Sequence, residues 1–112
     1  AYRDNNPLAD HLSFNNGDLE VDVKKFEVKK KGELLNLTPN EIKILITLIS
    51  NPGQVFTREQ LVEKAFGFDY DGFDRTIDTH IKNIRQKIED NPKKPNYITT
   101  VYSVGYKFGG NR

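Results

Sequence analysis

Cysteine, methionine and tryptophan are all absent from this chain of 112 residues. Without cysteine, the chain can form neither disulfide bonds nor metal sites built on thiolates. Because methionine is missing even at position 1, we expect the chain to be a processed product or an excised piece of a longer protein.

Long hydrophobic runs are missing as well. The longest, residues 42–49, is interrupted by Lys43 and Thr47 and is too short to cross a bilayer. The N-terminal letters AYRDNNPLAD differ from a signal peptide, because no apolar segment follows the charged residue. We therefore expect a cytoplasmic protein with no membrane partner. A hydrophobic content of 36% and a charged content of 29% fit one modest globular domain.

Positive charge is concentrated in the last third of the chain. Residues 75–112 carry eight Lys and Arg against three Asp and Glu, a net charge of +5. Residues 1–74 carry nine against thirteen, a net charge of −4. Such a polarised distribution favours an anionic partner for the C-terminal third, and chance variation in a small protein is the alternative.

The first part of the chain predicts a linker followed by a small sheet. Residues 1–10 are polar and read as the remnant of an interdomain linker, so the domain itself is expected over 11–112. Short apolar runs between residues 12 and 37, punctuated by Gly17 and Gly32, predict antiparallel strands joined by turns. The letters KKKGE suit a hairpin tip with solvated lysines.

Two helices begin at capping sequences. The letters TPNE place Thr38 as N-cap, Pro39 in the first turn and Glu41 three residues on, which completes a capping box. The letters NPG at 51–53 end this helix. The letters TREQ at 57–60 repeat the capping pattern before a second helix.

A third helix is predicted over residues 75–89, with the letters RTIDTHIKNIRQKIE. At about 100° per residue, its isoleucines fall within an arc of about 60° and form the stripe that docks on a core. These isoleucines are Ile77, Ile81, Ile84 and Ile88. The opposite face is basic and rich in amides, with Arg75, Thr79 and Gln86 at its centre and Lys82 and Asn83 beside them. After it, YITTVYSVGYKF predicts two strands around a turn at 103–105.

From the residues alone, two interpretations of this polar face stay open. It is either an ordinary solvated surface or a surface for nucleic acid. Arginine can form forked hydrogen bonds with guanine, Asn and Gln can pair with adenine, and threonine can bind phosphate. The two short capped helices before it resemble a helix-turn-helix, and the following hairpin could lie along the sugar-phosphate backbone as a wing.

Three stretches together resemble the effector domain of OmpR/PhoB-type response regulators: LTPNEIKIL, TREQLVEKAFGFDYDGFDRTIDTHIKNIRQKIED and YITTVYSVGYKF. The resemblance covers roughly residues 12–108. It implies an α+β winged helix-turn-helix fold, with an N-terminal four-stranded antiparallel sheet, three helices and a C-terminal β-hairpin wing. It also implies sequence-specific binding of double-stranded promoter DNA and transcription regulation, as the output domain of a bacterial two-component phosphorelay.

The resemblance assigns roles to residues by position. The recognition helix 75–89 would lie in the major groove, with Thr79, Lys82 and Asn83 approaching bases. Contacts to phosphates or the sugar-phosphate backbone would come from Arg75, Thr76, His80, Arg85 and Lys87, and from Thr100, Tyr102 and Tyr106 of the wing 97–108. A loop that family members use to contact RNA polymerase would consist of Gly67, Phe68, Asp69, Tyr70, Asp71, Gly72, Phe73 and Asp74.

The chain departs from the family pattern at several of these positions. Tyr102 and Ser103 stand where many members have arginine and glycine, so we expect Tyr102 to pack or to touch sugar rather than to read the minor groove. Asn83 replaces a common second basic residue, which predicts a different base preference. Phe66 replaces a common tryptophan. For Phe66 and Phe68, packing onto the core is the alternative to a role in the loop.

Other classes of function have little support in the sequence. His11 and His80 lie far apart, and neither a glycine-rich phosphate loop nor a nucleophile motif is present, so we expect no enzyme, catalytic residue or cofactor. The letters DYDGFD lack the spacing of a calcium loop, so no metal is expected. A winged helix used only for protein contacts remains the rival, because fold does not fix function.

The resemblance also implies partners that the residues do not reveal. These are RNA polymerase, an N-terminal receiver domain and a cognate sensor kinase. Two copies would bind direct repeats of DNA head to tail, whereas the isolated chain would be a monomer or a weak dimer.

Overall fold

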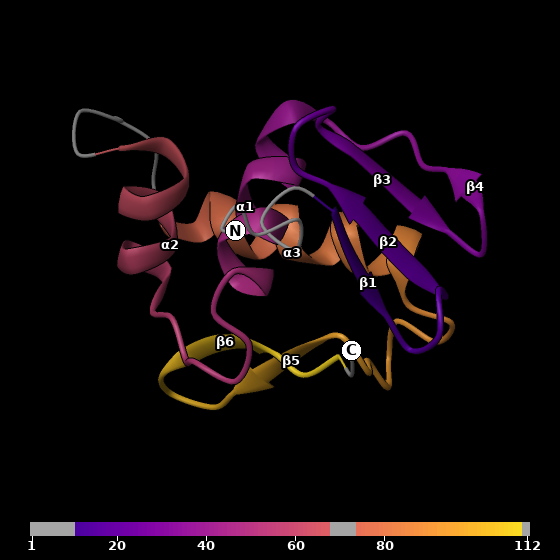
Figure 1. Ribbon diagram of the computed structural model, residues 1–112. Helices are drawn as coiled ribbons and strands as arrows, with labels where there is room; N and C mark the ends of the chain where they lie inside the picture. The colour runs from indigo at the N-terminus through magenta and orange to yellow at the C-terminus, as the bar shows by residue number, and fades with distance from the viewer. Residues whose placement is uncertain (1–10, 68–73, 111–112) are drawn as a thin grey trace, which may run out of the picture. The chain divides into compact units, whose positions relative to one another are not determined.

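The structure, a computed structural model, describes residues 11–67 and 74–110 (Figure 1). The contacts between Cα atoms divide the chain into two units, one reaching to Asn36 and one spanning Leu37–Gly110. Residues 1–10, which the sequence assigned to a linker, lie outside the described part.

The first unit is a four-stranded antiparallel sheet in the order β1-β2-β3-β4. Its strands are β1 (His11–Phe14), β2 (Leu19–Asp22), β3 (Glu27–Lys30) and the short β4 (Glu33–Leu34). The turns depend on left-handed backbone conformations, such as Gly17 at φ 88° and Gly32 at φ 83°, which glycine adopts without a steric penalty. Hydrophobic residues alternate with polar ones, as a sheet with one buried face requires. The buried residues are Leu12, Phe14, Leu19, Val21 and Val28.

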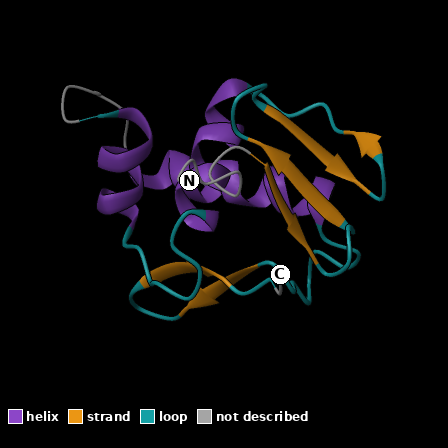
Figure 2. Ribbon diagram, in the orientation of Figure 1, coloured by secondary structure: helices purple, strands orange, loops and turns teal. Residues whose placement is uncertain are grey.

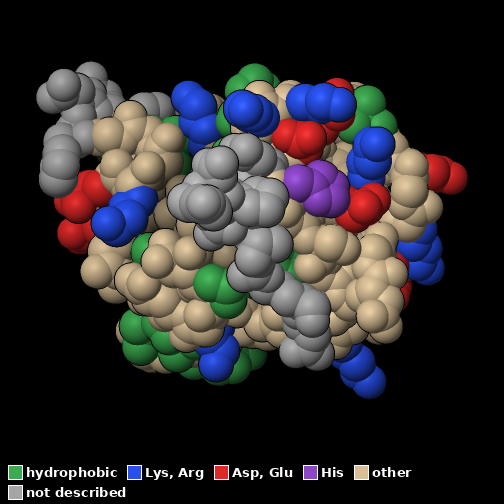
Figure 3. Space-filling view, in the orientation of Figure 1, with side chains coloured by type: hydrophobic (Ala, Val, Ile, Leu, Met, Phe, Trp, Pro, Cys, Tyr) green, Lys and Arg blue, Asp and Glu red, His purple; other side chains and the backbone are tan. Residues whose placement is uncertain are grey.

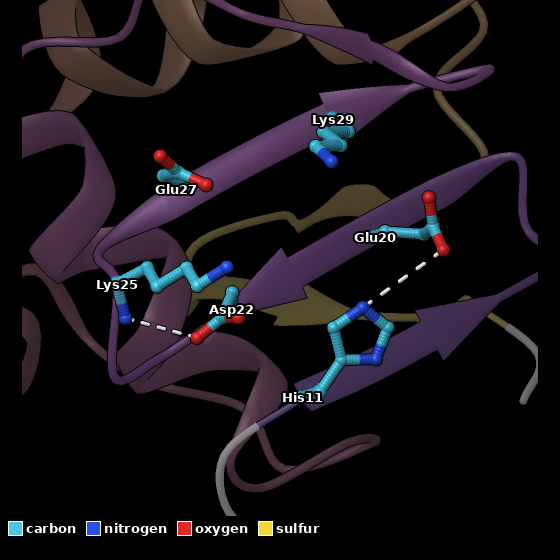
Figure 4. A pocket seen from close by; sticks show the side chains of 6 residues that line it. All are labelled: His11, Glu20, Asp22, Lys25, Glu27 and Lys29. Carbon is cyan, nitrogen blue, oxygen red and sulfur yellow. Dashed lines mark hydrogen bonds and ion pairs between the residues drawn. The ribbon is translucent and has the colours of Figure 1, made fainter.

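The other face of this sheet carries charges of both signs. In Figure 4, His11, Glu20 and Lys29 stand on three neighbouring strands, and Nε2 of His11 lies 3.9 Å from Oε2 of Glu20. Figure 3 shows Asp, Glu, Lys and Arg side chains interspersed around a histidine on this side of the molecule. Because acids and bases alternate here, the face offers no concentrated positive charge for a polyanion.

One lysine at the hairpin tip differs from the expectation that it is merely solvated. Nζ of Lys30 lies 2.9 Å from Oδ2 of Asp18, and the lysine side chain is only 11% exposed. The backbone N–H of Lys31 also donates to the carbonyl of Asp18, at 2.7 Å. Asp18 therefore ties the β1–β2 turn to the β3–β4 turn, a link between distant turns that the lysine run did not reveal.

The second unit contains three helices and a hairpin, which Figure 2 colours by secondary structure. The helices are α1 (Pro39–Ile49), α2 (Arg58–Phe66) and α3 (Asp74–Ile88), and the hairpin joins β5 (Ile98–Val101) to β6 (Gly105–Phe108). Both predicted capping boxes are confirmed, at Thr38 with Glu41 and at Thr57 with Gln60. Among the described residues, none of the helices is long and apolar enough to cross a membrane.

The core of the second unit includes the predicted isoleucine stripe. Ile77, Ile81, Ile84 and Ile88 are each at most 1% exposed. Leu45, Leu48 and Leu61 of the first two helices are also fully buried and belong to the same core. The stripe thus explains why α3 docks with one side only.

The hairpin is also fixed to the segment before α2. Phe56 and Tyr106 exchange two backbone hydrogen bonds, at 2.8 and 2.9 Å. Gly105 makes this approach possible, because a Cβ atom there would stand 1.9 Å from the carbonyl oxygen of Phe56. Glycine is therefore required at the start of β6 by contact with a neighbouring backbone.

Candidate nucleic-acid interface

The side of α3 opposite the isoleucines is uncovered. Thr79, Lys82 and Gln86 are exposed, and Asn83 is half-buried. Their hydroxyl, ammonium and amide groups can contact phosphates or base edges. Arg75 and Thr76 belong to the same helix, but their side chains lie outside the described part of the structure.

His80 lies at the border of this face. Its ring is half-buried and meets the ring of Phe66 edge-on, with centroids 6.3 Å apart. The residue that the sequence left between two interpretations, Phe66, therefore contacts α3 from the end of α2. The contact orients the imidazole of His80, whose predicted role toward phosphate stays a prediction.

Arg85 connects α3 to the hairpin. Its Nε and Nη2 donate to the carbonyl of Ile98 at 3.0 and 2.8 Å, and Nη2 also donates to Oγ1 of Thr100 at 2.8 Å. A planar guanidinium suits this forked geometry better than an ammonium group would. The structure thus gives Arg85 and Thr100, both predicted to contact DNA, a bond to each other.

Lys87 points to the opposite flank of α3. Its Nζ lies 3.1 Å from Oε1 of Glu41, a carboxylate whose side chain is only 4% exposed. The same oxygen of Glu41 accepts the backbone N–H of Thr38 in the capping box of α1. Lys87 therefore compensates a buried negative charge. To make its predicted contact with DNA, its ammonium group would have to bind Glu41 and a phosphate at the same time.

Asp78 of α3 joins two further elements. One oxygen of its carboxylate accepts two hydrogen bonds, one from Nε of Arg58 at 2.8 Å and one from the hydroxyl of Tyr106. Burial alone would raise the pKa of Asp78, but the hydrogen bonds from Arg58 and Tyr106 outweigh it and hold that pKa below its usual value. Burial and the bond to Asp78 raise the pKa of Tyr106. This cluster links α2, α3 and β6.

Tyr106 therefore has a partner inside the protein. Its side chain is largely buried, with the residue 6% exposed, and its hydroxyl is used by Asp78. The guanidinium groups of Arg58 and Arg85 lie 6.0 and 5.5 Å from the centre of its ring. The sequence reasoning missed Arg58 and Asp78, because their partners stand 20 and 28 residues away and no local pattern marks them.

The tip of the hairpin exposes apolar side chains. Tyr102 is 88% exposed and Val104 is 48% exposed. Ser103 between them has φ 67°, a left-handed conformation, and the N–H of Val104 closes the turn on the carbonyl of Val101 at 3.0 Å. The tip is thus a short, fixed projection available to a surface outside the protein.

The proposed polymerase-contact loop is described only at its ends. Gly67 ends α2 with φ 98°, and Asp74 is the first residue of α3. Residues 68–73, with Phe68, lie outside the described part. In the described part, no group of three or more His, Asp or Glu side chains is arranged to hold a metal ion.

The chain is similar to known proteins over most of its length. Residues 32–108 match the family described as "Transcriptional regulatory protein, C terminal". The DNA-binding response regulator MtrA of Mycolicibacterium smegmatis is 38% identical over 107 residues, 96% of this chain and 46% of MtrA. The sensory transduction protein RegX3 of the same species is 39% identical over 94 residues, 84% of this chain and 41% of RegX3. The chain spans less than half the length of these curated relatives.

Solved structures share the fold. The response regulator DrrB of Thermotoga maritima, an OmpR/PhoB homolog, gives a TM-score of 0.77 at 42% identity, over 87% of this chain and 44% of DrrB. The DNA-binding domain of RstA from Klebsiella pneumoniae, in complex with the RstA box, gives 0.76 at 34% identity, over 88% of this chain and 96% of that domain. The predicted winged-helix fold is confirmed.

Proposed function

Because the chain belongs to the family of C-terminal domains of transcriptional regulatory proteins, in its OmpR/PhoB class, we propose that it binds double-stranded DNA sequence-specifically and regulates transcription. It would do so as the output domain of a two-component response regulator. The observation that carries the proposal is the polar, uncovered side of α3, opposite a stripe of isoleucines that are all buried.

The proposed contact with bases is made by α3 in the major groove, whose width admits one helix. Thr79, Lys82 and Asn83 would face base edges. Arg75, Thr76 and His80 would contact phosphates near the start of the helix. The side chains that fix α3 on the core point elsewhere, so that entering the groove would require no rearrangement of the isoleucine stripe.

The proposed role of the hairpin is to contact the backbone beside that groove. Thr100 is exposed on β5, and Tyr102 projects from the tip, where its ring would touch sugar. For Tyr106 and Arg85 we propose mainly a positioning role, since their polar groups hold the hairpin against α3. Lys87 would add to the positive potential near DNA while it stays paired with Glu41.

The remaining partners are proposed from the likeness to the family. We propose that a receiver domain precedes this chain in the full protein, that a sensor kinase controls it in the cytoplasm, and that residues 67–74 contact RNA polymerase. Two copies would bind direct repeats of promoter DNA head to tail. The small share of MtrA and RegX3 that the chain covers, together with the C-terminal position named in the family's description, supports a preceding domain.

Selection of bound duplexes from a random pool, followed by a salt titration, tests the DNA-binding proposal. We expect one enriched motif. The logarithm of the binding constant should fall linearly with the logarithm of the salt concentration, with a slope of about −0.9 for each phosphate contacted. If no duplex is enriched, or if the affinity does not depend on salt, the proposal is wrong and a winged helix for protein contacts is favoured.

A further inference from the structure

A surface groove of about 420 Å³ runs between α3 and the turn that follows it. It overlaps the polar face of the helix at Lys82 and Gln86 and extends from there to the turn. The residues that line it are Lys82, Arg85, Gln86, Asn91, Pro92 and Lys93. Three are basic and none is acidic, in contrast to the mixed charges on the polar face of the sheet.

The carboxylates nearest to this groove in sequence are used elsewhere or do not line it. Glu89 is 7% exposed, and its two oxygens accept the backbone N–H groups of Asn96, Tyr97 and Ile98. Asp78 is held by Arg58 and Tyr106. Asp90 is exposed but is not among the residues that line the groove. The positive potential of the groove is therefore not cancelled within it.

Asn91 accepts two hydrogen bonds that fix the turn carrying Lys93, one with its side chain and one with its backbone. Oδ1 of Asn91 accepts the N–H of Lys93 at 3.1 Å, and the carbonyl of Asn91 accepts the N–H of Lys94 at 2.9 Å. Such a turn, with proline at its second position, loses little entropy when a ligand binds. Over the described residues, the ammonium groups of Lys82 and Lys93 have no ion-pair partner.

Arg85 presents fixed donors to the same groove. Its bonds to Ile98 and Thr100 use Nε and Nη2. A guanidinium has five N–H groups, so the two on Nη1 are left for an acceptor, given that the described residues supply none. Two ammonium groups that line the same groove as a guanidinium held by Ile98 and Thr100 form a site suited to phosphate oxygens.

We propose that this groove binds the phosphodiester strand at the edge of the major groove that α3 occupies, with Lys93 as its outermost contact. The inference rests on the proposed function. The hairpin lies along this flank of α3, as the bonds from Tyr106 to Asp78 and from Arg85 to Thr100 show. Because the hairpin is proposed to contact the sugar-phosphate strand that borders the major groove, that strand would pass between α3 and the hairpin.

The test compares Lys93→Gln with Lys94→Gln, which removes the same charge one residue outside the groove. A duplex selected by the wild-type chain is used, and affinity is measured over a range of salt concentrations. We expect Lys93→Gln to bind about 3- to 10-fold more weakly at low salt, with a slope less steep by about 0.9 and an unchanged base preference. Lys94→Gln should match the wild-type chain.

A second measurement locates the phosphate. Neutral methylphosphonate is placed at each backbone position in turn, and at one position it should weaken the wild-type chain but not Lys93→Gln. In NMR titrations at equal phosphate concentration, the Lys93 amide signal should shift with duplex and not with inorganic phosphate. A shift with inorganic phosphate alone would assign the groove to a free anion and overturn the proposal.

The remaining outcomes separate the two claims. If the wild-type chain binds a duplex with a steep salt dependence and Lys93→Gln equals Lys94→Gln, the groove proposal is wrong while the proposed function stands. If the wild-type chain binds no duplex, both fail.

Discussion

The hydroxyl of Tyr106 on β6 donates to the carboxylate of Asp78 on α3, and the same carboxylate oxygen also accepts Arg58 of α2. Three elements that stand apart in the sequence therefore meet at one oxygen atom. Since α3 would contact the major groove and the hairpin would contact the backbone beside it, their mutual orientation matters as much as their separate surfaces. This bond and the bonds from Arg85 to Ile98 and Thr100 set that orientation.

The first prediction concerns Tyr106→Phe, which removes only the hydroxyl. We expect the free energy of unfolding to fall by about 1–2 kcal/mol, because the charged carboxylate of Asp78 loses one hydrogen-bond donor. DNA affinity should fall while base preference stays the same, since no base contact is removed. Urea denaturation and duplex titration measure the two effects.

Tyr102→Phe is the matched control for this change, because Tyr102 is 88% exposed. It should leave the free energy of unfolding within about 0.5 kcal/mol of the wild-type value. Equal stability of the two variants would show that the hydroxyl of Tyr106 does not hold the wing.

The second prediction concerns the pH dependence of Asp78. Its pKa is lowered in the folded protein, so it binds a proton more readily when unfolded, and its stabilising contribution is present above its ordinary pKa of about 3.9. That contribution is lost as pH falls through the lowered pKa. The difference in unfolding free energy between wild type and Asp78→Asn should be constant from about pH 5 to 8 and shrink below about pH 4.

Denaturation curves for both proteins across this range test the prediction. Other carboxylates titrate in both proteins and largely cancel in the difference. A difference that stays constant to the lowest pH at which both fold would mean that Arg58 and Tyr106 do not favour the charged form of Asp78.

Much of the fold follows from local patterns in the sequence. The capping boxes at Thr38 and Thr57 are satisfied within four residues, and the isoleucine stripe needs only helical spacing, so both were predictable. The partners of Asp78 and Arg85 were not, because each contact joins residues that only the tertiary fold brings together. A basic residue on a helix gives no sign in sequence of whether it faces DNA or, like Lys87, a buried carboxylate.

The role of Glu89 was also not visible in the sequence. In sequence it is one of three acids in a basic region, whereas in the structure it is buried and accepts three backbone N–H groups of the segment leading into β5. The third prediction is that Glu89→Ala destabilises the chain by about 2–4 kcal/mol, because these donors lose their acceptor in a buried place.

Glu63→Ala, on an exposed position of α2, is the control and should change stability by less than about 0.5 kcal/mol. Thermal and urea unfolding of the two variants provide the measurement. Should Glu89→Ala unfold like Glu63→Ala, water would have to satisfy the three donors and the carboxylate would not organise the turn.

The fourth prediction concerns base readout by α3. Asn83 is half-buried beside exposed Lys82 and Thr79, and an amide can pair with adenine in the major groove. We expect Asn83→Ala to lose about 1–3 kcal/mol of discrimination at one base pair of the selected site. Arg75→Ala should instead weaken binding to all duplexes alike, because a phosphate contact carries no sequence information.

Competition binding against every single-base variant of the selected site distinguishes these effects. For Asn83→Ala the loss must be confined to one position, while the affinity for unrelated duplexes stays near that of the wild-type chain. For Arg75→Ala the ratio of specific to nonspecific affinity must persist while both affinities fall. If neither substitution changes the total affinity or that ratio, the side of α3 that carries Thr79, Lys82 and Asn83 does not enter the groove, and the orientation proposed for the helix on DNA is wrong.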